Sequence, residues 1–136
     1  MKKSNIFNNA FQKIVVIVTV VVVIIYIYKD VVKKNKIIKH HEFSIGKITK
    51  YHSSGSPESF HLRYSYTIDK QQFYERSIHA PFEKFPGCEH DFSICSDKRF
   101  WVAHEKDDPS NSLINIDIEI QDIENPKPPK NLDGFR

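Results

Sequence analysis

The chain has 136 residues and a net charge of +3, and this small positive value hides two parts of opposite charge. Residues 1–41 hold eight Lys and one Asp, whereas residues 42–136 hold twelve Lys and Arg against sixteen Asp and Glu. The second part is therefore acidic. This argues against a nucleic-acid-binding domain, because such a domain needs basic residues on its folded surface.

An apolar run of 15 residues, 14–28, lies between Lys13 and Lys29. As a helix it would be about 22 Å long, so its flanks must complete the roughly 30 Å hydrocarbon core of a bilayer. The two lysines can extend their ammonium groups to the headgroups, and the two tyrosines at the end of the run suit an interfacial aromatic belt. We therefore predict a membrane anchor with the interface residues Lys13, Tyr26, Tyr28 and Lys29.

A cleaved signal peptide is the competing interpretation, because basic residues also precede the apolar core of a secretory signal. No small-residue cleavage pattern follows the run, so we expect the segment to be retained. Three lysines precede the run and five follow it up to residue 39. This near balance leaves undecided which side of the membrane holds the C-terminal part.

Beyond residue 41 the sequence has the pattern of strands. Residues 60–68 alternate between apolar and polar, which is the period of a strand with one buried face. Shorter patterns of the same kind predict a set of five strands at 43–51, 60–68, 71–78, 99–104 and 113–120. The last of them is expected to place four isoleucines on one face: Ile114, Ile116, Ile118 and Ile120.

Residues that favour turns separate these strands. The segment 53–57 ends the first strand, Asp69–Lys70 forms a hairpin turn, and 106–112 joins the last two strands. The segment 81–98 shows no clear period and is compatible with a loop or a short helix. After Glu124, three prolines predict an extended polar tail, because proline cannot continue a central strand.

These patterns predict a mainly β protein with an N-terminal single transmembrane helix followed by a small antiparallel β-sheet. We expect the sheet to curl toward a barrel, since open sheet edges need protection. The predicted segments are a short basic N-terminus at 1–13, a transmembrane anchor at 14–32, a basic juxtamembrane linker at 33–41, a small β-domain at 42–122 and a polar Pro-rich tail at 123–136.

The two cysteines and seven histidines raise the question of a metal site. The best zinc candidates are Cys88, His90, Cys95 and His104, but their spacing differs from the paired ligands of structural zinc sites. We predict no metal ligands and no cofactor. A Cys88–Cys95 disulfide is expected if the domain lies outside the cytoplasm, and two free buried thiols are the alternative.

Catalytic signatures are also missing. The chain has no G-x-S-x-G elbow, no phosphate loop and no dinucleotide fingerprint. Asp107 and Asp108 stand beside Pro109 in a predicted turn, where carboxylates usually accept hydrogen bonds from backbone amides. We therefore predict no catalytic residues, no enzymatic activity and no small-molecule substrate.

The aromatic residues of the predicted strands leave one further possibility open. Most of them alternate with polar residues and should belong to the core, yet some could line a surface for a partner or ligand. The candidates for such a face are Tyr64, Tyr66 and Trp101.

A resemblance to a known class of proteins rests on short motifs spread over residues 14–120. A membrane helix is followed by Ile-Gly-Lys-Ile at 45–48, by Tyr-Ser-Tyr at 64–66, and by Arg-Phe-Trp-Val at 99–102 with an Asp-Pro turn at 108–109. This order resembles small, uncharacterised single-span membrane proteins of Bacteroidetes-type bacteria. The hairpin at 69–71 lacks the Gly common in that class. The resemblance implies a membrane-anchored fold, in the bacterial inner membrane, and no activity.

The function expected from the sequence is that of a membrane-anchored, non-catalytic module that binds a protein or serves the cell envelope. Its expected partners are the lipid bilayer and an unidentified protein, reached by an edge strand or by the aromatic face. The alternative is an immunity or inhibitor protein at the membrane, because a small acidic domain suits a basic target. An unrecognised enzyme is a third, less favoured, interpretation.

Overall fold

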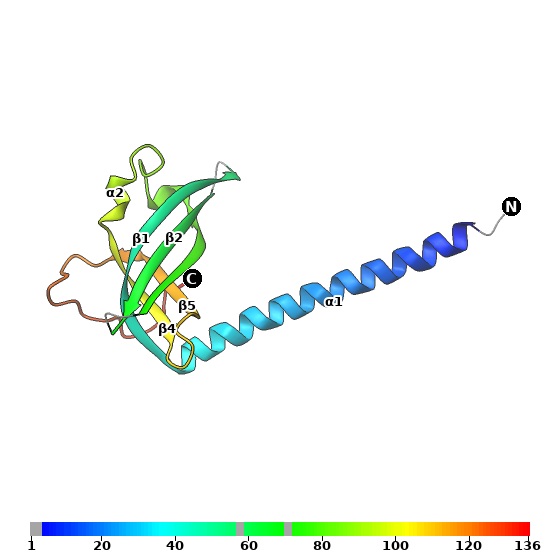
Figure 1. The fold of residues 1–136 in the computed structure, drawn as a ribbon, viewed down its shortest axis with the longest axis horizontal. Coiled ribbons are helices and arrows are strands. Elements are labelled where there is room, and N and C mark those ends of the chain that lie inside the picture. Colours follow the sequence, from blue (N-terminus) through cyan, green and yellow to red (C-terminus); the bar gives the residue numbers. More distant parts are fainter. Residues whose placement is uncertain (1–3, 57–58, 70–71) are drawn as a thin grey trace. The chain divides into compact units, whose positions relative to one another are not determined.

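A computed structural model describes residues 4–56, 59–69 and 72–136. The chain divides into two compact units, Met1–Asn35 and Lys36–Arg136. The first unit is helical, and the second holds a five-stranded sheet (Figure 1).

The N-terminal helix, α1, spans Ser4–Lys39. Its segment Phe11–Lys39 contains an 18-residue window with a mean hydropathy of 2.5 and is long and apolar enough to cross a membrane, a property that a signal sequence can share. The predicted interface residues, two lysines and two tyrosines, all lie on this helix. The helix extends to Lys39, so most of the predicted linker at 33–41 is helical. No Gly or Pro interrupts the sequence there, so nothing ends the helix earlier.

The second unit is built on a single antiparallel sheet, curled in Figure 1, with the strand order β3-β2-β1-β4-β5. The mainly β fold with a helix followed by a small antiparallel sheet is therefore confirmed. The strands are β1 (His41–Ser56), β2 (Ser59–Ile68), β3 (Gln72–Pro81), β4 (Arg99–Glu105) and β5 (Ser112–Glu119).

The alternation in β2 produces the core, as the sequence predicts. Leu62, Tyr64 and Tyr66 are buried on one face of the strand, and Arg63 and Thr67 are exposed on the other. The buried face joins residues of β1, β4 and β5 in one cluster, which includes Ile48, Phe60, Leu62, Tyr64, Tyr66, Phe100, Val102, Ile114 and Ile116. This apolar cluster holds the sheet together, because burial of apolar surface is the main favourable contribution to folding.

The segment between β3 and β4 contains both structures that the sequence allowed. It forms a short 3₁₀ helix, η1 (Phe82–Lys84), and one turn of α-helix, α2 (Ser93–Ser96). Three of its side chains, Phe85, Cys88 and Cys95, belong to the core cluster. The segment therefore covers the core face of the sheet.

The first strand is longer than predicted and takes in most of the predicted turn at 53–57. β1 continues to Ser56 because Ser53 pairs with Phe60 and Ser56 with Ser59. Pro57, the last residue of the predicted turn, lies outside the described residues. In the following hairpin Asp69 has a φ of 52°, a left-handed conformation that Asp tolerates in turns, while Lys70 lies outside the described residues.

The prediction for the last strand is wrong at one position. Ile114, Ile116 and Ile120 are buried, but Ile118 is 64% exposed. The cause is a register shift, since Phe100 pairs with Glu119 whereas the next residue, Trp101, pairs with Asn115. Extra residues in one strand of a pair break the alternation of its faces.

The predicted tail is also attached more closely than expected. Phe135 forms a bridge with Asn115 of β5, and Arg136 exchanges two backbone hydrogen bonds of 3.0 and 3.1 Å with Ile114. The end of the tail therefore pairs with the outer edge of β5.

Gly46 provides a test of the packing at the centre of the sheet. It pairs with Tyr66 on one side and with Phe100 on the other, and a Cβ atom added there would lie 2.6 Å from Cγ2 of the buried Val102. We expect Gly46→Ala to lower the free energy of unfolding by about 1–3 kcal/mol, because the closely packed neighbours have no room to move.

Chemical denaturation of the full chain in detergent measures this change. The matched control is Lys47→Ala in the same strand, whose side chain is exposed and whose loss should cost no more than about 0.5 kcal/mol. Equal stability of the Gly46→Ala variant and the unmodified chain would contradict the packing described.

Candidate functional site

The three aromatic residues predicted to form a partner or ligand face do not share one face of the sheet. Tyr64 and Tyr66 are buried in the core, with 0% and 2% exposure. Trp101 follows Phe100, a member of the same core, and successive side chains in a strand point to opposite faces. The three residues therefore belong to two separate environments.

The two tyrosines end in a buried polar cluster. The Tyr64 hydroxyl lies 3.0 Å from Oγ of Ser112, and the Tyr66 hydroxyl donates to the carbonyl oxygen of Pro109. Burial raises the pKa of both hydroxyls, that of Tyr66 to about 12, because the charged form loses its hydration. Both tyrosines therefore remain neutral at physiological pH and link β2 to the turn before β5.

A serine and a histidine lie at hydrogen-bond distance in the same cluster. The Ser44 Oγ and His104 Nε2 atoms are 3.1 Å apart, and the imidazole ring stacks on Tyr66 with ring centroids 5.8 Å apart. His104 is 2% exposed, and burial lowers the pKa of its imidazole. Its other ring nitrogen lies 3.4 Å from the backbone oxygen of Glu105.

This Ser–His pair has the spacing of a nucleophile and its base, but its surroundings suit a structural role better. An orienting carboxylate normally holds the base in such a pair. Here the Glu105 carboxylate accepts a hydrogen bond of 2.9 Å from Asn111 and lies 3.6 Å from Nζ of Lys36. We interpret the pair as a buried hydrogen bond that satisfies two polar side chains.

The four residues considered for zinc are distributed over different environments. Cys88 and Cys95 are joined in a disulfide, with their Cα atoms 5.9 Å apart, within the usual range. His90 is exposed in the intervening loop, and His104 is a buried residue of β4. The disulfide lies in the core, where it ties the ends of a loop that covers the sheet.

Local hydrogen bonds shape this disulfide loop. Gly87 has a φ of 87°, a conformation that favours glycine, and its carbonyl oxygen accepts from the backbone N–H groups of His90 and Asp91. The Asp91 carboxylate accepts from the hydroxyl and the backbone N–H of Ser93, which lowers the pKa of Asp91. These contacts begin the single turn of α2.

Trp101 belongs to a second aromatic group on the other face of the sheet. Its ring lies 6.0 Å from that of Phe43, which in turn lies 5.8 Å from Phe135 near the end of the chain. A shallow groove of about 360 Å³ runs beside Trp101, lined in part by the exposed Ile118 and by Pro126. The C-terminal segment thus contributes to both the aromatic group and the groove.

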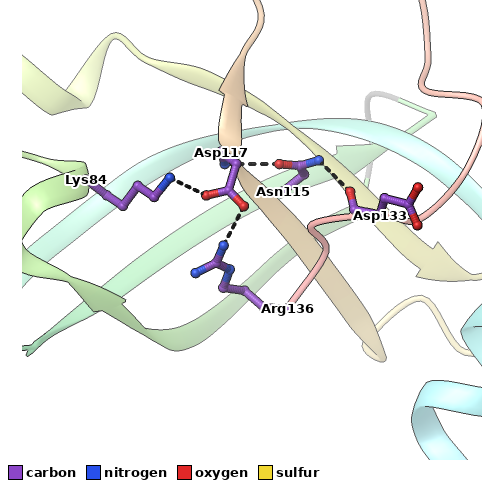
Figure 2. A network of polar contacts seen from close by, with 5 residues as sticks. All are labelled: Lys84, Asn115, Asp117, Asp133 and Arg136. Carbon is purple, nitrogen blue, oxygen red and sulfur yellow. Dashed lines mark hydrogen bonds and ion pairs between the residues drawn. The ribbon is translucent and has the colours of Figure 1, made fainter.

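A polar network holds the C-terminal segment against β5, as Figure 2 shows. The Asp117 carboxylate lies between Lys84 Nζ, at 2.6 Å, and Arg136, at 2.5 Å, and these cations lower its pKa, Lys84 most strongly. The Asn115 side chain accepts from the Asp117 backbone N–H and donates to the Asp133 carbonyl oxygen. The Arg136 guanidinium and the Asn115 amide therefore fix the end of the chain beside the strand, while Lys84 links η1 to the same carboxylate.

The two edges of the sheet differ as a result. The outer edge of β5 is paired with residues near the end of the chain. The other edge strand, β3, has only β2 as a neighbour in the strand order, and no further strand of the described residues pairs with it. β3 is therefore a ten-residue strand at the edge of the sheet.

The structure also brings together three residues that sequence analysis missed. His61 of β2 pairs with His52 of β1 on one side and with His79 of β3 on the other. The ring centroids are 5.2 and 4.2 Å apart. We call these three residues the histidine row. Their spacing in the sequence gives no signal, because only the register of two hairpins aligns them.

Comparison with known proteins found no matching family model, no matching curated protein and no matching solved structure. Functional interpretation therefore depends on the geometry of the described residues.

Because the His104 imidazole is buried, we predict that the stability of the fold depends on pH. Since burial places the folded-state pKa of His104 below its ordinary 6.5, protonation favours the unfolded chain, and stability should be lost as the pH falls through about 6.5. Melting of the full chain in detergent at pH 7.5 and 5.5 measures this. His104→Gln, which cannot be protonated, should show a smaller drop between these values.

The control variant is His90→Gln, at an exposed position of the disulfide loop, and it should keep the drop of the unmodified chain. An equal drop in the His104→Gln variant would show that other groups cause the pH dependence.

Proposed function

We propose that the chain is a membrane-anchored, non-catalytic binding module in which β3 receives an extended segment of a protein partner. The observation that carries this proposal is that the two edges of the sheet differ in their pairing. The β5 edge is paired with the chain's own C-terminal residues, whereas among the described residues β2 is the only strand that pairs with β3. Sheet edges that stay open are natural templates for an added strand.

The side chains of β3 would give such an interaction its specificity. Glu75, Ser77 and His79 are exposed on one face of the strand. Glu75 lies 3.4 Å from Arg63 of the neighbouring strand. A charge in the middle of an edge strand discourages indiscriminate pairing, including pairing with a second copy. A partner strand is thus selected by its side chains and held by its backbone.

The anchor part of the proposal rests on α1. Its apolar side chains, from Phe11 to Val31, are exposed in the structure, which would be unfavourable in water. A bilayer supplies the missing apolar environment over the length of one span. The resemblance to single-span proteins of Bacteroidetes-type bacteria supports an inner-membrane location.

A charged residue introduced in the middle of α1 tests whether this helix anchors the protein in the membrane. Val21→Arg should cost about 2.5–3.5 kcal/mol of insertion free energy, because the bilayer centre cannot solvate the guanidinium group. We expect the variant to leave the membrane fraction after an alkaline wash, while the control Val21→Leu stays. An Arg variant that remains in the washed membranes would overturn the anchor.

Site-specific photo-crosslinking in cells tests the proposed edge. A photoreactive residue at Ser77 of β3 should give one defined adduct with another protein, because the added strand would lie beside it. The control position is Asp107, exposed in the turn between β4 and β5. Adducts at both positions, or at neither, would contradict the assignment of β3 as the binding edge.

A further inference from the structure

The histidine row lies on the face of the sheet opposite the core. His52 and His79 are exposed and His61 is half-buried, while the neighbours of His61 in β2, Phe60 and Leu62, point into the core. Each pair in the row is directly opposite across two strands, so the backbone fixes the Cβ atoms of neighbours roughly 5 Å apart. Three imidazoles are thus held side by side by backbone pairing alone.

The separations suit shared ligation of a metal ion. A tetrahedral ion bound to two imidazoles at about 2 Å per nitrogen places the ring centroids roughly 5 Å apart. The observed separations are 5.2 Å for His52–His61 and 4.2 Å for His61–His79. Both values are close to this requirement, and small rotations of exposed side chains make up the difference.

The charges around the row bear on which species can bind. Lys50 and Arg63 lie beside it on the same face, and Arg63 is itself paired with Glu75 at 3.4 Å. Only a neutral imidazole has a lone pair for a metal, so a metal ion competes with protons for the row.

We propose that the histidine row is a surface binding site for a divalent transition-metal ion such as Zn²⁺ or Ni²⁺. His61 and His79, whose rings are closest, bind the ion first, and His52 completes the site by a rotation of its side chain. Among the described residues no three His, Cys, Asp or Glu side chains already surround a metal position. The site therefore assembles when the ion arrives, with water in the remaining coordination positions.

The ligand chemistry limits the choice of ion. Imidazole nitrogens suit Zn²⁺, Ni²⁺ and Cu²⁺, whereas Mg²⁺ and Ca²⁺ prefer oxygen ligands. The flanking lysine and arginine further disfavour ions that bind mainly by charge. The row should therefore discriminate strongly between Ni²⁺ and Mg²⁺.

Calorimetric titration of the full chain in detergent, purified without a polyhistidine tag, tests the proposal with Ni²⁺ as the probe. The unmodified chain should bind one Ni²⁺ saturably and should not bind Mg²⁺. His61→Asn should weaken binding by at least the ~10-fold that loss of even an outer-shell partner causes. The matched control is His90→Asn, in the exposed disulfide loop, which should bind Ni²⁺ as the unmodified chain does.

Proton competition gives an independent readout, because binding should be weaker at pH 5.5 than at pH 7.5. If His61→Asn does not fold, His79→Asn at the exposed end of the row serves the same purpose. Absence of saturable Ni²⁺ binding by the unmodified chain would overturn the proposal. Binding of equal strength by the unmodified chain and a folded His61→Asn or His79→Asn variant would overturn it as well.

Discussion

The pairing of β1 with β2 on one side and with β4 on the other is the constraint on which the second unit depends. β1 is the central strand, and its residues 46 and 47 are matched with partners on both sides. Gly46 has no side chain at the point where Tyr66 and Phe100 flank it, which lets Val102 pack closely. Once this register is set, the alternation of side chains between the two faces determines which side chains contact one another.

Both faces of the sheet follow from that register. On one face the tyrosines of β2 reach the polar groups of the β4–β5 turn and of the first residue of β5, and the disulfide loop covers the apolar remainder. On the other face β1, β2 and β3 hold the histidine row, and β1 and β4 hold the Phe43–Trp101 group. A shift of one residue in any pair would exchange these faces.

Several features could be predicted from the sequence because local patterns determine them. The long apolar run gives α1, and the strict alternation from Phe60 to Tyr66 gives β2 and its buried face. The mainly β fold follows from repeating such short patterns between turn-forming residues. The pattern in the last strand failed at Ile118, because a register shift against β4 has no signature in the sequence of β5 alone.

Other features depend on pairing between distant parts of the chain. A two-residue turn at Asp69–Lys70 would place His61 opposite Ile78, whereas the structure pairs Ile68 with Gln72 and so brings His61 opposite His79. The candidate metal site thus depends on one residue of turn length. The attachment of Phe135 to β5 could not be predicted from the sequence either, since the Pro-rich sequence before it has no strand pattern.

The pairing of residues 135 and 136 with β5 also has a consequence for how the sheet can open. Residues 121–134 join the strand to its cover without forming a helix or strand of their own, so the cover can detach while β1 to β5 stay paired. The detached state exposes the β5 edge in addition to that of β3. Wrong association is therefore expected to begin with local opening at residues 135 and 136, without unfolding of the sheet.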